Sequence, residues 1–342
     1  MAQQKIHHNL IEPPLIFSGT SYLGISQNKA FRQLIIEGLN LYGNNFGGSR
    51  NGNTAPLIYD AAETFLSNWL TLPQSVLVSS GTLAATFLKE LILKEYHCFY
   101  EPDVHPSIYI NNKKERSKMP IAFQEVVQLK IKQDLSKKYA ICLNSIDPLY
   151  LSEKKFDWLD DLPQRADILV VIDDSHGIGV IGREGNGTAE EIAQLNLKKY
   201  IIYGSLGKAL GTPAGFITGN APSLLKAIKQ SSLFAGASPL LPAYAYAFMN
   251  GENIFIQQRK KLRANIAYFT AHLPTQNTLK FLPGYPVFYS TNQNLGKKLK
   301  AQNIHISSFS YPSKDGPLLN RIVLNANHKK KELKKLLEEL GK

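Results

Sequence analysis

The sequence predicts an α/β fold, because strand-like and helix-like segments alternate through the middle of the chain. Several short runs rich in apolar and β-branched residues have the length of buried strands, at 139–143, 168–172, 200–203 and 214–218. The 342 residues are enough for two domains with a sizeable core. We therefore expect a large domain with a mostly parallel central sheet flanked by helices, followed by a smaller α+β domain.

The first predicted elements of the large domain are a helix, a strand and a second helix. Residues 61–70 fit a helix, because apolar side chains recur there every three or four positions. Residues 74–78 fit a strand, and residues 82–94 fit the helix that follows it. This order of elements continues the alternation that defines the α/β class.

The pattern changes after about Gly236, where a long helix is predicted at 244–272 and short strands at 287–289 and 321–324. A basic amphipathic helix is predicted at the C-terminus, with its leucines on one face. We expect three parts, namely an N-terminal segment (1–45), a large domain (46–235) and a small domain (236–342).

The formal net charge of +12 suits a polyanionic partner, either a nucleic acid or a small phosphorylated substrate. Much of the excess is scattered or terminal, as in residues 329–335. No zinc-finger spacing, aromatic RNA-binding pattern or recognisable helix-turn-helix accompanies the charge. We therefore expect a small polyanionic substrate, no nucleic-acid binding and no metal site.

The start of the chain, Met1–Leu10, is polar, and no stretch approaches eighteen uninterrupted apolar residues. We expect neither a secreted nor a membrane-spanning protein. The two cysteines, Cys98 and Cys142, both lie beside apolar residues in strand-like runs. Buried thiols in a reducing cytoplasm fit this placement better than a disulfide.

Two residues at the ends of predicted strands suggest a pyridoxal phosphate site. Lys208 lies in a glycine-flanked turn, and Asp173 follows the apolar run 166–172. A lysine that binds an aldehyde cofactor needs a carboxylate that keeps the pyridine nitrogen protonated, and Asp173 is placed for that role. His176 follows three residues later, within reach of the same ring. Either element alone has an ordinary structural explanation, but the combination in this order indicates an enzyme.

These motifs, with Ser79-Ser80-Gly81-Thr82 and the segments 42–50, 204–211 and 321–328, resemble the α-oxoamine synthases. The resemblance runs from about Phe17 to the C-terminus. It implies a fold-type I pyridoxal phosphate enzyme that condenses an amino acid with an acyl-CoA and releases carbon dioxide. It also implies a homodimer whose active sites are shared between the subunits, and it gives the positive charge a use in attracting coenzyme A phosphates.

The resemblance implies cofactor contacts from segments along the whole chain, namely Ser80, Gly81, Thr82, His105, Ser145, Asp173, His176, Ser205, Lys208 and Ser238. Ser80-Gly81-Thr82 lies between a strand and a helix, where free N–H groups favour a phosphate. His105 matches a histidine that stacks on the cofactor ring, and Lys208, His176, Asp173 and His105 would be catalytic. Ser238 would reach the phosphate from the partner subunit.

Substrate contacts are implied for Arg321, which matches an arginine that binds the amino-acid carboxylate, and for Ser21. Ser21 stands near the position of a family asparagine that helps to hold the substrate carboxylate, so the resemblance leaves a different amino-acid selection open. Ser145 stands in a segment that is shorter than its family counterpart and lacks a glycine and an aspartate.

Within the family, we favour the reaction that joins alanine to a pimeloyl thioester to give 8-amino-7-oxononanoate. This reaction is a step of biotin synthesis. Glycine with acetyl-CoA and serine with a long acyl-CoA remain open. An aminotransferase on the same fold is a rival, and so is a degenerate pyridoxal phosphate protein with a binding or regulatory role. The presence of Lys208, Asp173 and His176 argues against the degenerate alternative.

Overall fold

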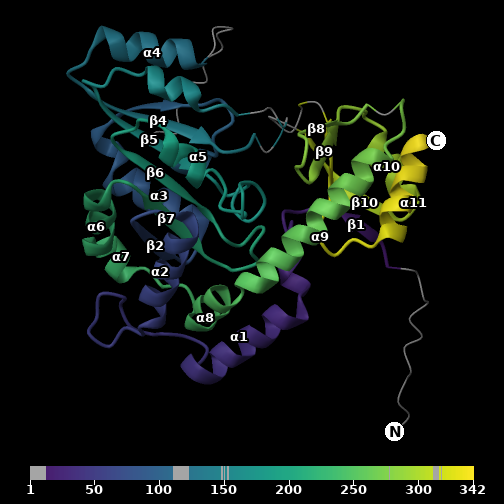
Figure 1. Ribbon diagram of the computed structural model, residues 1–342, viewed down its shortest axis with the longest axis horizontal. Helices are drawn as coiled ribbons and strands as arrows, with labels where there is room; N and C mark the ends of the chain where they lie inside the picture. The colour runs from purple at the N-terminus through teal and green to yellow at the C-terminus, as the bar shows by residue number, and fades with distance from the viewer. Residues whose placement is uncertain are drawn as a thin grey trace.

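The computed structural model describes residues 13–110, 123–147, 149, 151, 154–276, 278–310, 316 and 318–342. The polar start Met1–Leu10 lies outside these residues. Two sheets organise the described chain, at opposite sides of the view in Figure 1. The larger sheet has the order β2 (Gln74–Val78), β7 (Gly215–Gly219), β6 (Tyr200–Ser205), β5 (Asp167–Asp173), β4 (Lys138–Asn144) and β3 (His97–Tyr100).

The larger sheet is mostly parallel, as predicted. Neighbouring strands from β3 to β6 pair in parallel, and only β7 runs antiparallel, to both β6 and β2. The carboxyl ends of β2 to β6 therefore meet at one edge. The predicted strands at 74–78, 139–143, 168–172 and 200–203 lie within these elements, and the one at 214–218 overlaps β7.

Helices cover both faces of this sheet, which explains the continuous apolar runs of its strands. Leu169 and Val171 of β5 face a core formed with α3 (Gly81–Leu91), α6 (Pro222–Gln230) and α7 (Ser232–Gly236). Val170 and Ile172 face the opposite core. The helices that contribute to that second core include α2 (Ile58–Leu70), α4 (Phe123–Gln133), α5 (Ala189–Gln194) and α8 (Pro242–Asn250).

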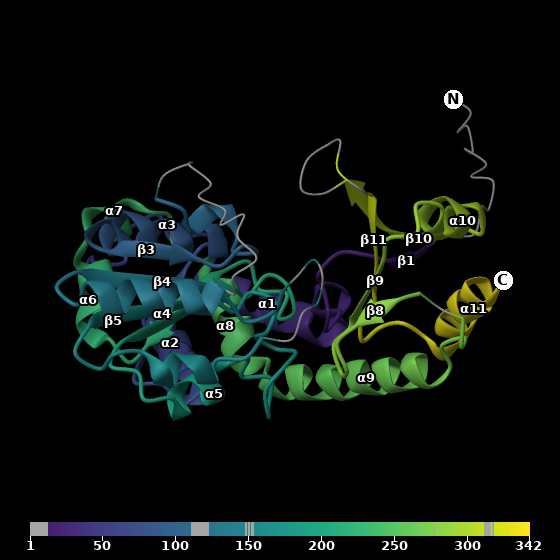
Figure 2. The same cartoon turned by 90° about the horizontal axis from the view of Figure 1, so that it is seen from above.

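The predicted long helix at 244–272 is two helices in the structure, α8 and α9 (Glu252–Ala271), which are separated by Gly251. A Cβ atom at Gly251 would lie 2.8 Å from the Ala247 carbonyl oxygen and 2.9 Å from the Phe255 ring. Glycine is also a weak helix former. The chain therefore turns at this residue, and α9 runs on alone to the second sheet (Figure 2).

The smaller sheet has the order β1 (Leu15–Phe17), β10 (Ile304–Ser310), β11 (Leu318–Val323), β9 (Val287–Ser290) and β8 (Lys280–Phe281). The predicted N-terminal segment is divided between the two halves. β1 pairs in parallel with β10, whereas α1 (Lys29–Tyr42) packs against α8. The remaining helices are α10 (Leu295–Ala301), α11 (Lys330–Gly341) and the short 3-10 helices Ile25–Gln27, Leu93–Glu95, Pro106–Ile108 and Asp157–Asp161. We retain the domain division near residue 236 as a proposal.

Candidate active site

A cavity of about 530 Å³ opens at the edge where the parallel strands of the larger sheet end. This is the edge at which α/β proteins place their ligands. The cavity brings together most of the residues predicted for the site, namely Ser80, Gly81, Thr82, His105, Asp173, His176, Ser205 and Lys208. Each of them lies at or just after the end of a strand, so the sheet itself sets their positions.

The start of α3 forms a cradle for an anion on one side of the cavity. Ser80 caps the helix through a side-chain oxygen that accepts from the Leu83 N–H at 3.1 Å. A Cβ atom at Gly81 would lie 2.9 Å from the Cβ of Ser205, and one at Gly215 would lie 2.1 Å from the Ser80 carbonyl oxygen. Both glycines are therefore required for the close approach of β6 and β7 to the turn. Helix N-termini of this kind bind phosphate groups.

Lys208 projects its amine toward His176, with 2.8 Å between Nζ and the histidine Nε2. Burial lowers the pKa of Lys208, and the nearby Arg321 adds to this, while Asp173 acts in the opposite direction. Burial also lowers the pKa of His176 well below its ordinary value, helped by the positive charges of Lys208 and Arg321. The pair therefore favours a neutral amine, which is the nucleophilic form.

Asp173 ends β5, and its Oδ1 accepts from the Ser175 N–H at 2.9 Å. This bond fixes the carboxylate at the floor of the cavity. His105 lies on the exposed side of the cavity, and its Nδ1 is 2.8 Å from the hydroxyl of Ser107. The imidazole is thus held by its own loop and can present a ring face to a ligand.

Arg321 of β11 belongs to the smaller sheet but lies close enough to lower the pKa values of Lys208 and His176 by its charge. Its buried Nε and Nη2 atoms have no hydrogen-bond partner among the described residues. Two unpaired buried nitrogens are costly, and a carboxylate would satisfy both with two parallel hydrogen bonds. The geometry therefore fits an acidic ligand at this point between the two sheets.

Besides Arg321, three predicted site residues lie apart from the cavity lining, namely Ser145, Ser238 and Ser21. Ser145 is buried, and its Oγ would lie 2.9 Å from a Cβ atom at Gly177. Its backbone N–H donates to the Asp173 carbonyl oxygen at 3.0 Å. Ser238 is exposed beyond the end of α7. Ser21 contacts the hydroxyl of Ser26 at 3.2 Å.

The sequence analysis missed several residues that line the cavity. Asn144 occupies the position next to Asp173 in the pairing of β4 with β5, and its side chain donates to the Asp103 carbonyl oxygen at 2.8 Å. Asn144 directly follows a predicted strand, and this position could have marked it as a site residue. Tyr109 and Leu149 add apolar surface, and no motif marked them.

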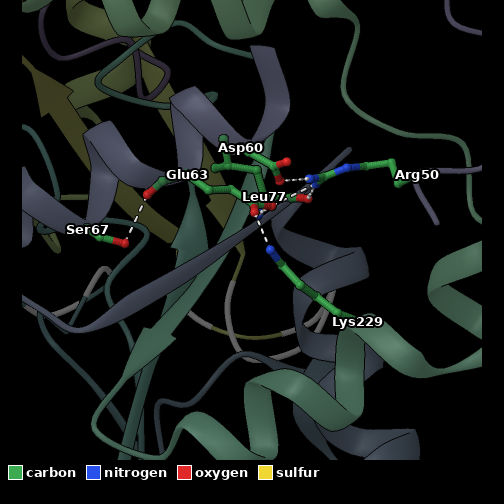
Figure 3. A network of polar contacts seen from close by, with 6 residues as sticks. All are labelled: Arg50, Asp60, Glu63, Ser67, Leu77 and Lys229. Atoms are coloured by element: carbon green, nitrogen blue, oxygen red, sulfur yellow. Dashed lines mark hydrogen bonds and ion pairs between the residues drawn. The ribbon is translucent and has the colours of Figure 1, made fainter. Parts of the chain in front are cut away.

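Arg50 ends a segment used for the family resemblance, and the structure places it in a buried ionic network away from the cavity (Figure 3). Its Nη1 donates to Glu63 of α2 at 2.7 Å and to the Leu77 carbonyl oxygen of β2 at 3.0 Å. Lys229 of α6 contacts the other Glu63 oxygen at 2.6 Å. The network ties two helices to the strand that leads into Ser80, so it supports the phosphate cradle from behind.

Comparison with known sequences identifies a family. A family model described as aminotransferase class I and II matches residues 141–340. The 8-amino-7-oxononanoate synthase of Buchnera aphidicola subsp. Baizongia pistaciae is 26% identical over 352 residues, which cover 95% of this chain and 88% of that protein. A putative 8-amino-7-oxononanoate synthase of Methanococcus vannielii is 25% identical over 340 residues, covering 96% and 91%.

Solved structures share the fold. A serine palmitoyltransferase of Sphingomonas wittichii superposes with a TM-score of 0.80 at 16% identity, covering 96% of this chain and 86% of that one. An 8-amino-7-oxononanoate synthase of Francisella tularensis gives 0.70 at 20% identity, covering 96% and 97%. The chain belongs to the aminotransferase class I and II family, in its α-oxoamine synthase group, and has the fold-type I architecture that the sequence predicted. Enzymes of this family use pyridoxal phosphate.

The described residues contain neither a metal-binding cluster nor a membrane-spanning helix. Among the described residues, no cluster of three or more histidine, cysteine, aspartate or glutamate side chains is arranged to hold a metal ion. Within the same residues, every helix is too short or too polar to cross a membrane. Both cysteines are free thiols; Cys142 is buried and Cys98 half-buried.

Proposed function

We propose that this protein binds pyridoxal phosphate in the cavity and condenses an amino acid with an acyl-CoA, giving an amino ketone, free coenzyme A and carbon dioxide. The observation that carries the proposal is the position of the Lys208 amine. It lies 2.8 Å from His176, in a cavity that also holds Asp173 and the start of α3. The family membership supports the same chemistry.

The residues present fit pyridoxal phosphate. The start of α3 with Ser205 suits the phosphate, because glycine at position 81 leaves the turn open and close to β6. Lys208 would hold the aldehyde carbon, Asp173 the pyridine nitrogen and His105 a face of the ring. When bound, the cofactor supplies an electron sink for the amino-acid carbon that loses a proton or a carboxyl group.

The amino acid would bind through Arg321, whose unpaired nitrogens suit a carboxylate and would orient it. His176, next to the lysine amine, is placed to hold or move a proton at its Nε2. Ser21 stays a proposed second contact to the amino acid, and Ser145 a proposed contact to the cofactor. An Asp173→Asn variant is expected to lose most turnover, and undiminished turnover would remove the electron-sink argument.

For the substrates we favour alanine and a pimeloyl thioester. Relatives named 8-amino-7-oxononanoate synthase align with nearly the whole chain, which supports this choice. The likeness to serine palmitoyltransferase structures concerns the fold alone, because the identity is 16%. Other amino acids and acyl donors, amino-group exchange and a degenerate binding protein are the alternatives that the following experiment separates.

The test is the release of coenzyme A by the purified protein with pyridoxal phosphate, measured with a thiol reagent. Alanine, glycine and serine are each combined with pimeloyl-, acetyl- and palmitoyl-CoA, and Lys208→Ala is the inactive control. We expect release with alanine and pimeloyl-CoA. Release with another pair would correct the substrate. Silence throughout, together with amino-group exchange between alanine and an oxo acid, would replace the synthase by an aminotransferase. Bound pyridoxal phosphate without either reaction would favour the degenerate binding protein.

A second copy of the chain is the proposed partner. Exposed large apolar side chains lie on α1, on α7 and directly before α2 and α8, namely Ile36, Leu39, Leu41, Tyr42, Leu233, Leu57 and Leu241. Leu57 is 81% exposed, and contact with a partner would remove its side chain from water. Ser238 lies between Leu233 and Leu241 in the chain, so a partner that covers these two leucines would also lie near Ser238. Sedimentation that shows an active monomer would refute the proposal.

A further inference from the structure

Tyr22 contacts the ring nitrogen of His176 that faces away from Lys208. Its hydroxyl lies 2.9 Å from Nδ1, and Nε2 of the same ring lies 2.8 Å from Nζ of Lys208. Each ring nitrogen of His176 thus has one hydrogen-bond partner among the described residues. The histidine is therefore held between the amine and a phenol, and the phenol comes from a distant part of the chain.

The position of Tyr22 is fixed by its surroundings. The residue is fully buried, and its hydroxyl is 3.3 Å from that of Tyr285. Tyr285 also donates to the His176 carbonyl oxygen at 3.1 Å, so it braces both members of the pair. The Tyr22 carbonyl oxygen accepts from the Ala326 N–H at 2.9 Å. Little freedom is left for the phenol to turn away from the imidazole.

The Tyr22 phenol differs from a carboxylate in its hydrogen-bonding capacity at this position. A hydroxyl both donates and accepts, whereas an ionised carboxylate only accepts. Tyr22 can therefore satisfy Nδ1 with or without its proton, so Nε2 is free to accept from Lys208 or to donate to it. Burial is the main cause that lowers the pKa of His176, and the charges of Lys208, Arg321 and His105 act in the same direction, so the imidazolium is disfavoured.

We propose that Tyr22 is the positioning residue of His176, which fixes the plane of the imidazole and keeps both tautomers available at the face toward Lys208. The proposal rests on the proposed function, because a neutral histidine that either accepts or donates beside the lysine serves proton movement there. Tyr285 holds Tyr22 through its hydroxyl and does not itself contact the His176 ring nitrogens.

The test compares Tyr22→Phe with Tyr59→Phe. Tyr59 is also buried, but its hydroxyl has no hydrogen-bond partner among the described residues, so its removal is a matched control. The protein is labelled with nitrogen-15 in its histidines and loaded with pyridoxal phosphate. The ring-nitrogen resonances of His176 are assigned by their disappearance in His176→Gln, and kcat and KM are measured in parallel.

We expect Tyr22→Phe to move the Nδ1 resonance of His176 and to lower kcat about tenfold or more, as for one lost buried hydrogen bond. A change in KM would report the interaction of the same hydroxyl with Arg321. Tyr59→Phe should change neither. Tyr285→Phe, which keeps the contact to Nδ1, should cause a smaller shift in the same direction and gives a second test where Tyr22→Phe folds poorly.

Unchanged His176 resonances and unchanged kcat in Tyr22→Phe would overturn the proposal, and so would equal effects of Tyr22→Phe and Tyr59→Phe. The resonances also separate this proposal from the proposed function. A wild-type protein that releases no coenzyme A would refute the synthase, while the Nδ1 comparison would still decide whether Tyr22 holds His176.

Discussion

Replacement of Glu63 by glutamine would test whether the buried ionic network behind the phosphate cradle stabilises the fold. The Glu63 side chain is 5% exposed and that of Arg50 is 6% exposed. The Glu63 carboxylate accepts from Nη1 of Arg50 at 2.7 Å, from Nζ of Lys229 at 2.6 Å and from the Leu77 N–H at 2.8 Å (Figure 3). The amide keeps the shape of the carboxylate but leaves the buried Arg50 guanidinium without its near counter-charge. Loss of one partner from a buried pair costs about 3–5 kcal/mol.

Asp60 provides the matched control, because it is the other carboxylate near Arg50. Its oxygen is 3.7 Å from the guanidinium, and its side chain is 71% exposed. Asp60→Asn is therefore expected to cost less than about 1 kcal/mol. Urea unfolding followed by circular dichroism measures both variants against the parent protein. Equal and small losses from Glu63→Gln and Asp60→Asn would refute the reasoning that burial decides the value of this ion pair.

Three further predictions concern the candidate site. Lys208→Ala is expected to abolish the attachment of pyridoxal phosphate to the chain by borohydride, followed by mass spectrometry; an adduct in the variant would contradict the lysine assignment. Gly81→Ala is expected to weaken cofactor binding about tenfold or more, because the new Cβ atom would lie 2.9 Å from the Cβ of Ser205; an absorbance titration with unchanged affinity would contradict this. Burial raises the pKa of Asp174 from 3.8 to about 7. The folded state therefore binds this proton more tightly than the unfolded state, so the free energy of unfolding decreases as pH rises from 3.8 to about 7, by at most about 1.4 kcal/mol per pH unit. Asp174→Asn should reduce this decrease in urea unfolding experiments across the window, and an identical decrease in the variant would contradict it.

The large sheet was predictable because its central strands are buried on both faces and therefore form continuous apolar runs. β2 coincides with the predicted range 74–78, and β5 extends its prediction by one residue at each end. Elements without such a pattern were missed. β1 has only three residues, and it exists because it pairs with β10, far away in the sequence. No local period can reveal a strand of this kind.

Part of the candidate site could likewise be predicted from the sequence, and part could not. Asp173, Ser205 and Lys208 could be placed together from the sequence, because parallel strands end at a common edge. The contact of Tyr22 with His176 could not be predicted, because nothing near either residue indicates the other. Their meeting depends on how the smaller sheet lies against the larger one.

The N-terminal strand has a direct consequence for the site. β1 is joined to β10 and is followed by Tyr22, whose chain segment is held by the second half of the protein. Gln258 of α9 donates to the Leu23 carbonyl oxygen at 2.9 Å, and Asn327 donates to that of Gly24 at 2.8 Å. The phenol that touches His176 is therefore carried by the smaller sheet and α9, together with Arg321. Any motion of that half relative to the larger sheet would move Arg321 and the contact of Tyr22 with His176 together. Under the proposed function, binding of the amino-acid carboxylate and the state of His176 would therefore change together.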